Sequence, residues 1–106
     1  MSDPKSRDKG DVALDTRTEK KLKAPSLYRV VLLNDDYTTM EFVVAVLRHV
    51  FHHTEDTAQA IMLHIHERGR GVAGVYTFEV AETKSAHVLD LAHKAEFPLQ
   101  CVVEPE

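Results

Sequence analysis

The sequence predicts an α+β domain: a small three-stranded antiparallel sheet packed on three helices, in the order β-α-α-β-α-β. Three short segments have the apolar and β-branched content of strands, and three longer segments repeat apolar residues at helical spacing. Residues 1–25 contain few large apolar side chains and should form a flexible N-terminal extension. The folded domain is therefore expected to span residues 26–106.

The strands are predicted at residues 27–33, 72–80 and 99–103. The first of them is largely apolar on both faces, which indicates a central position in the sheet. The helices are predicted at about residues 39–52, 55–67 and 83–95. Their expected core positions are Val43, Val46, Leu47 and Val50; Ala58, Ile61, Met62 and Ile65; and Val88, Leu91, Ala92 and Ala95.

Capping patterns mark the starts of the first two helices. Thr38 followed by Glu41 fits a capping box, in which a hydroxyl and a carboxylate satisfy free amides at a helix start. Thr54 precedes two acidic residues and should cap the second helix.

Charge and hydropathy exclude two classes of partner. The chain has a net charge of −4, but residues 1–25 carry +2 and residues 26–106 carry −6, so the folded part should repel nucleic-acid backbones. The longest apolar run, residues 42–47, is far shorter than the roughly 20 residues of a membrane-spanning helix. We expect a cytoplasmic, monomeric protein that binds neither nucleic acid nor membrane.

The most informative segment connects the first strand to the first helix. It places Asn34, Asp35, Asp36 and Thr38 just before Met40. If this loop meets Met62, Ile65 and His66 of the second helix, the two form an apolar pocket with a polar collar. In the alternative interpretation, the loop is only an Asx-type turn, the methionines fill gaps in the core and His66 lies on the surface.

Other candidate sites are weaker. His49, His52 and His53 have spacing that could share a metal, but no cysteine or His-Glu-x-x-His pattern accompanies them, so we expect no metal site and no cofactor. The lone Cys101 fits a small core side chain better than a nucleophile. No catalytic residue is predicted.

Glu79, Glu82 and Lys84 mark the predicted turn from the second strand to the third helix. Taken alone, they fit an ordinary acidic helix entry, since carboxylates are favoured at a helix N-terminus.

Four segments together resemble one protein family. They are YRVVLLNDDYTTMEFV at 28–43, MLHIH at 62–66, GVYT at 74–77 and EVAETK at 79–84. This combination resembles ClpS, the bacterial adaptor of the ClpAP protease, over about residues 25–104. The resemblance implies a non-enzymatic adaptor that recognises a destabilising N-terminal Phe, Tyr, Trp or Leu (the N-end rule) and delivers the substrate to the ClpA unfoldase.

The resemblance also implies residue roles. Asn34, Asp35 and His66 would bind the α-amino group and the first peptide unit, with Asp36 and Thr38 shaping the rim. The hydrophobic pocket would consist of Met40, Val43, Met62, Ile65 and Leu99, with Met40 as a gate against β-branched side chains.

Docking on the ClpA N-terminal domain would use Glu79, Glu82 and Lys84, and the N-terminal extension would be engaged by the unfoldase during handover. Thr39 departs from the family pattern, which commonly has Pro at this position, and the missing ring should leave the loop less rigid. Two other classes remain as alternatives: a protein-interaction domain of similar layout, such as the ribosomal stalk C-terminal domain, and a His-dependent metalloprotein or hydrolase.

Overall fold

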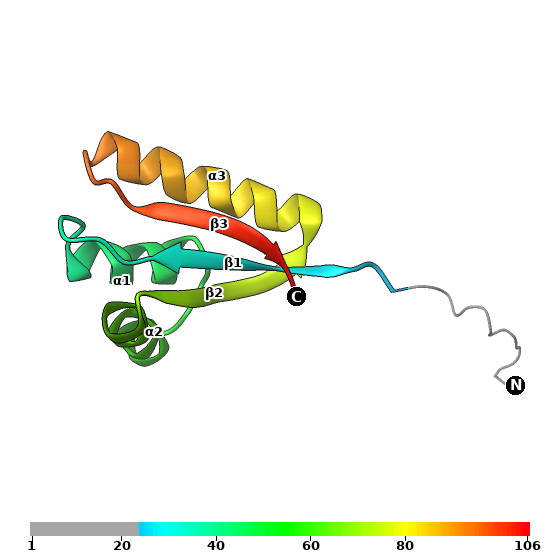
Figure 1. The fold of residues 1–106 in the computed structure, drawn as a ribbon, viewed down its shortest axis with the longest axis horizontal. Helices are drawn as coiled ribbons and strands as arrows, with labels where there is room; N and C mark the ends of the chain where they lie inside the picture. The colour runs from blue at the N-terminus through cyan, green and yellow to red at the C-terminus, as the bar shows by residue number, and fades with distance from the viewer. Residues whose placement is uncertain (1–23) are drawn as a thin grey trace, which may run out of the picture.

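The computed structural model describes residues 24–106, so the predicted N-terminal extension lies almost wholly outside the described residues. The described elements are β1 (Leu27–Leu33), α1 (Met40–His49), α2 (Glu55–Arg68), β2 (Arg70–Thr77), α3 (Phe78–Lys94) and β3 (Gln100–Pro105) (Figure 1). Their order confirms the predicted α+β fold.

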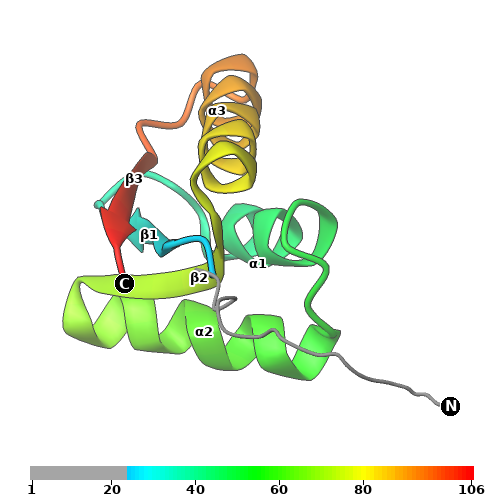
Figure 2. The same cartoon turned by 90° about the vertical axis from the view of Figure 1, so that its right-hand side faces the viewer.

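The sheet has the strand order β2-β1-β3, and both neighbours pair antiparallel with β1. The central position predicted for β1 from its two apolar faces is therefore confirmed. Val30, Val31 and Leu32 of this strand are completely buried. Seen from the side, α1 and α3 lie to one side of the sheet, and α2 lies along β2 (Figure 2).

The hydrophobic core fills the space between the sheet and the helices. The predicted helix positions Val43, Val46, Leu47 and Val50 are all buried, as are Ala58, Met62 and Ile65 of α2 and Val88 and Ala92 of α3. Cys101 is also buried there, and burial raises the pKa of its thiol, so it has the character of a core side chain. Ile61 and Leu91 are half-buried against this core, whereas Ala95 is exposed beyond the last turn of α3.

The predicted capping box at the start of α1 is wrong by one residue. The N-cap is Thr39, whose hydroxyl accepts a hydrogen bond from the Phe42 amide at 3.1 Å. The Thr38 hydroxyl instead donates to the Asp35 carboxylate, because the loop turns around that group. At the start of α2 the prediction is confirmed, since the Thr54 hydroxyl accepts from the Thr57 amide.

Helix α1 ends at His49, three residues before the predicted end. His52 has a positive φ of 62°, which a continuing helix does not allow. His53 then donates from Nε2 to the Ala73 carbonyl at 2.6 Å, which holds the connection to α2 against β2.

The boundary between β2 and α3 also differs from the prediction. Strand β2 ends at Thr77, which pairs with Leu27, the first residue of β1. Residues after Thr77 would therefore have no partner in β1. Helix α3 therefore begins at Phe78, and Glu79, Glu82 and Lys84 lie in its first two turns rather than at a strand end. The Phe78 ring packs edge-on against Tyr28, with ring centroids 5.1 Å apart.

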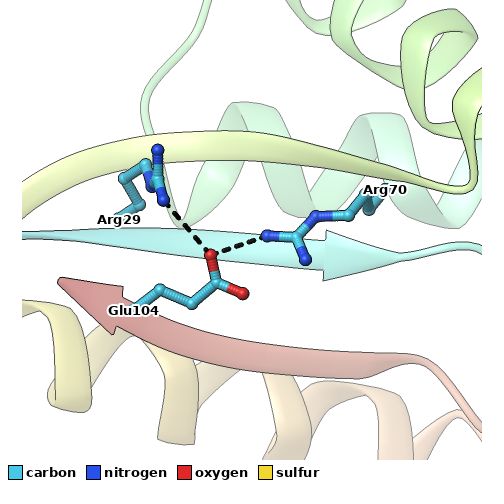
Figure 3. Close-up of polar contacts among 3 residues, drawn as sticks. All are labelled: Arg29, Arg70 and Glu104. Atoms are coloured by element: carbon cyan, nitrogen blue, oxygen red, sulfur yellow. Dashed lines mark hydrogen bonds and ion pairs between the residues drawn. The ribbon is translucent and has the colours of Figure 1, made fainter. Parts of the chain in front are cut away.

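An ion cluster joins the three strands (Figure 3). It lies on the face opposite Val30 and Leu32, because Arg29 alternates with these residues along β1. Glu104 of β3 accepts from Arg70 of β2 at 2.7 Å and from Arg29 of β1 at 3.5 Å. The hydrogen bond from Arg70, together with the two positive charges, lowers the pKa of Glu104.

Gly71 allows α2 to lie directly against β2. A Cβ atom at this position would lie 2.7 Å from Cγ1 of Ile65 and 3.3 Å from Cδ2 of His64. The first distance is far inside van der Waals contact, so any side chain here would push α2 outward.

We therefore expect Gly71→Ala to lower the free energy of unfolding by about 1–3 kcal/mol, through overpacking against Ile65. Urea denaturation followed by circular dichroism measures this change. Gln100→Ala, on an exposed strand position, is the matched control and should change it by less than about 0.5 kcal/mol. Equal stabilities of the two variants would contradict the close packing of α2 on β2.

Candidate functional site

A cavity of about 280 Å³ opens between the β1–α1 loop and α2. It brings together nine of the residues that the sequence singled out from two separate segments. They are Asn34, Asp35, Asp36, Thr38, Met40, Val43, Met62, Ile65 and His66. The two-sided pocket proposed from the sequence therefore exists as a cavity in the structure.

The loop takes its shape from the Asp35 carboxylate. Oδ1 accepts from the amides of Tyr37 at 2.8 Å and Thr38 at 2.7 Å, and Oδ2 accepts from the Thr38 hydroxyl at 2.8 Å. Partial burial alone would raise the pKa of Asp35, but these hydrogen bonds outweigh that effect and lower it. Asp35 thus stays ionised at the cavity rim while it fixes the positions of its neighbours.

A carboxylate has about four lone-pair sites. Three hydrogen bonds from the loop therefore leave Asp35 with room for a further donor from a ligand. The carboxylate both builds the loop and contributes negative charge to the cavity. The predicted binding role covers only the second of these, whereas the alternative interpretation, an Asx-type turn, anticipated the first.

The loop is also attached to the end of α2. The backbone N–H of Asn34 donates to the Gly69 carbonyl at 2.9 Å, which leaves the Asn34 side chain free for the cavity. Gly69 ends α2 with a left-handed φ of 90°, a conformation that glycine adopts readily. This contact places Asn34 near the last turn of α2, which carries His66.

The inner part of the cavity is apolar. Val43 and Met62 are each 7% exposed and Ile65 is 2% exposed, whereas Met40 is 44% exposed. Met40 thus lies at the mouth, where its flexible thioether side chain can adjust to what enters. Leu99, the fifth predicted pocket residue, is buried in the core and is not among the residues that line the cavity, so its role stays a prediction.

The acceptor groups and the apolar floor together define a ligand. Asn34, Asp35 and Asp36 supply oxygen acceptors at the rim, and two of the three are negatively charged. A suitable ligand has a cationic donor next to an apolar body. Within residues 24–106, no group of three or more His, Cys, Asp or Glu side chains could hold a metal ion, and no helix is long and apolar enough to cross a membrane.

The predicted docking residues lie on a separate surface. Glu79, Val80, Thr83 and Lys84 line a shallow depression at the start of α3, while Glu82 is exposed outside it. Phe78 and Val80 are 51% and 44% exposed in the same segment, so apolar side chains accompany the charged ones. The likeness of this surface to a docking site rests on the sequence resemblance, and its role stays a prediction.

Lys84 has a structural role that the sequence did not indicate. Its ammonium donates to the Val50 carbonyl at 2.7 Å, and it lies 5.9 Å from the ring centroid of Phe51 and 5.3 Å from that of Tyr76. Val50 is the C-cap of α1, where a positive charge is favourable. Lys84 therefore links α3 to the end of α1.

The comparisons with known proteins identify the family. The family described as "ATP-dependent Clp protease adaptor protein ClpS" matches residues 23–102. The chain belongs to the ClpS family. The resemblance drawn from the sequence is thereby confirmed, and all nine cavity residues fall within the matched range.

Relatives in this family are similar over most or all of their length. The ClpS adapter of Hyphomonas neptunium is 61% identical over 91% of this chain and 80% of the relative. The ClpS adapter of Maricaulis maris is 53% identical over the whole of both chains. Both are named as adapters of the Clp protease rather than as proteases.

A solved structure of the same family has the same fold. Agrobacterium tumefaciens ClpS2, in a structure with L-phenylalaninamide bound, is 47% identical, with a TM-score of 0.76. The match covers 78% of this chain and 100% of that one.

The lowered pKa of Asp35 predicts a pH-dependent stability. The contribution of the carboxylate is fully present above its ordinary value of 3.8 and is lost as the pH falls through the lower value in the folded protein. Asp35→Asn should therefore lower the free energy of unfolding by about 1–2 kcal/mol at neutral pH, and the difference from the unmodified chain should shrink as the pH falls below 3.8.

Urea denaturation at several pH values measures this difference. Asp36→Asn, which changes an exposed neighbouring carboxylate, is the control and should alter stability by less than about 0.5 kcal/mol. A difference for Asp35→Asn that stays constant or grows as the solution becomes acidic would contradict the role of the ionised carboxylate.

Lys84→Met should lower the free energy of unfolding by about 1–2 kcal/mol, because the buried Val50 carbonyl loses a charged donor. Thermal denaturation measures this loss. Glu82→Gln, two positions away and exposed, should have almost no effect. If Lys84→Met is as stable as Glu82→Gln, Lys84 acts only at the surface of α3.

Proposed function

We propose that this adaptor binds the free N-terminal residue of substrate proteins in the cavity between the β1–α1 loop and α2. The observation that carries the proposal is the acceptor-rich rim beside an apolar interior. The bound molecule in the related ClpS2 structure, L-phenylalaninamide, combines a free amino group with an aromatic side chain. It has the two properties that this cavity favours.

The rim recognises the amino terminus. An α-ammonium has three donors, and Asn34, Asp35 and His66 provide acceptors from opposite sides of the cavity. Hydrogen bonds that involve a charged group contribute roughly 1.5–3 kcal/mol each. Asp36 and Thr38 complete the rim, and Thr38 acts mainly by holding Asp35 in place.

The interior recognises the first side chain. Burying a Phe or Leu side chain contributes roughly 1.5–3 kcal/mol. Association costs at least several kcal/mol in lost translational and rotational freedom, so neither half of the site suffices alone. The favoured termini are Phe, Tyr, Trp and Leu, while Met40 at the mouth restricts residues that branch at Cβ.

The adaptor carries out no chemistry on the peptide. It works by presenting the bound substrate to the ClpA unfoldase of ClpAP, with Glu79, Glu82 and Lys84 docking on the ClpA N-terminal domain. Because Lys84 also contacts Val50, the docking surface is anchored to the helix that carries Met40 and Val43. The N-terminal extension takes part in handover, and the protein acts as a monomer in the cytoplasm.

Fluorescence anisotropy with labelled peptides tests the binding step. A peptide that begins with Phe should bind, whereas the same peptide with N-acetyl-Phe should bind at least about 100-fold more weakly, because two charge-assisted hydrogen bonds are lost. A peptide that begins with Ala lacks the apolar contact and should also bind weakly. A chelator should change nothing.

Equal binding of the acetylated peptide would exclude recognition of the ammonium group. A loss of binding in chelator would favour a metal-dependent site instead. The variant Asp36→Asn should weaken the Phe peptide less than Asp35→Asn, because Asp35 both accepts from the ligand and holds the loop.

A further inference from the structure

A second cavity, of about 430 Å³, lies where α1 and α2 pack against each other. We call it the helix groove. It lies alongside the peptide cavity described above, and seven of its residues do not line that cavity. They are Glu41, Val44, Ala45, Arg48, His49, Glu55 and Gln59.

The helix groove and the peptide cavity share two walls. Met40 and Met62 line both of them, so two flexible thioether side chains lie at the boundary between the two spaces. One face of α2 runs along both spaces. It carries Glu55, Gln59, Met62 and His66, which follow one another at spacings of four, three and four residues. Because Met40 borders both spaces, a chain that leaves the peptide cavity past Met40 could continue along the groove.

The groove has the chemistry of a site for extended polypeptide. Val44 and Met62 are buried and form an apolar floor, with the half-buried Ala45 beside them. Polar side chains form the walls: Arg48 pairs with Glu55 at 3.1 Å, and Gln59 donates to Glu55 at 2.8 Å. These partners are about half exposed, so the ion pair is weak and can exchange for hydrogen bonds to a peptide backbone.

The length of the groove defines how much polypeptide it can hold. Seven positions separate Met62 from Glu55 on α2, which is about 10 Å at a helical rise of about 1.5 Å per residue. An extended chain advances about 3.3 Å per residue, so about three residues cover this distance. The occupant is therefore the second to fourth residues of a substrate whose first residue fills the peptide cavity.

We infer that the helix groove is a second subsite, which binds residues two to four of the substrate in extended form and adds affinity beyond the N-terminal residue. This inference rests on the proposed function of the neighbouring cavity. It assigns to Ala45, Arg48, Glu55 and Gln59 a contact with substrate that the first residue alone cannot make.

The test compares ligands of increasing length by isothermal titration calorimetry on the full chain. L-phenylalaninamide probes the first residue, and the peptide amides Phe-Ala, Phe-Ala-Ala-Ala and Phe-Ala-Ala-Ala-Ala-Ala probe the groove. Affinity should rise by about tenfold from L-phenylalaninamide to the four-residue peptide, or about 1.4 kcal/mol, and then stay constant. Affinities that agree within about twofold for all lengths would overturn the second subsite.

Two variants locate the effect. Ala45→Phe fills the groove and should bring the four-residue peptide to within about twofold of L-phenylalaninamide, whose own affinity should not change. Ala60→Phe places the same ring on an exposed position of α2 outside both cavities and is the matched control. Full length dependence in Ala45→Phe would contradict the assignment.

Arg48→Ala gives a second measurement that does not require a larger side chain to be accommodated. It should weaken the four-residue peptide by about threefold or more and leave L-phenylalaninamide unaffected. If neither ligand is affected, the groove wall makes no contact with substrate. If the unmodified chain fails to bind even L-phenylalaninamide, the proposed function itself fails, which is distinct from a failure of the second subsite.

Discussion

The cavity depends on one ionised carboxylate. Asp35 accepts hydrogen bonds from the backbone amides of Tyr37 and Thr38 and from the Thr38 hydroxyl, and so turns the chain from the end of β1 to the N-cap of α1. The backbone of Asn34 is held separately by the Gly69 carbonyl, but without the Asp35 bonds the chain between Asn34 and the N-cap of α1 would have no fixed path. The Asp35 carboxylate, which its sequence context marks as a ligand contact, therefore also determines the structure of the loop.

Much of the fold could be predicted from the sequence, because hydrophobic periodicity reports directly on burial. The central position of β1 follows from its two apolar faces, and the order of elements follows from the alternation of strand and helix patterns. The errors concern boundaries that depend on tertiary contacts. Thr38 and Thr39 are both suitable N-caps, and Thr39 takes this role because the Thr38 hydroxyl is bound to Asp35. Strand β2 ends at Thr77 because its partner strand β1 begins at Leu27.

The candidate site was predictable where family motifs mark it and not elsewhere. The loop and α2 residues around the cavity carry a specific motif, so nine of them could be placed together from the sequence. The bond from Lys84 to Val50 joins residues 34 positions apart and has no local signature. The helix groove likewise arises from the packing of two helices whose exposed residues look like an ordinary solvated face.

The hydrogen bond from the backbone N–H of Asn34 to the Gly69 carbonyl extends the pairing of β1 with β2 by one residue beyond Leu33 and Arg70. The β1–α1 loop and α2, which form the two sides of the cavity, are therefore joined by the same series of backbone hydrogen bonds that pairs β1 with β2. The spacing between Asn34 and Gly69 is thus set by the sheet, while the Asp35 hydrogen bonds set the path of the loop beyond it. The cavity should therefore keep its dimensions between the empty and occupied states. The proposed selectivity therefore rests on a preformed frame, to which the 44% exposed Met40 side chain can adjust.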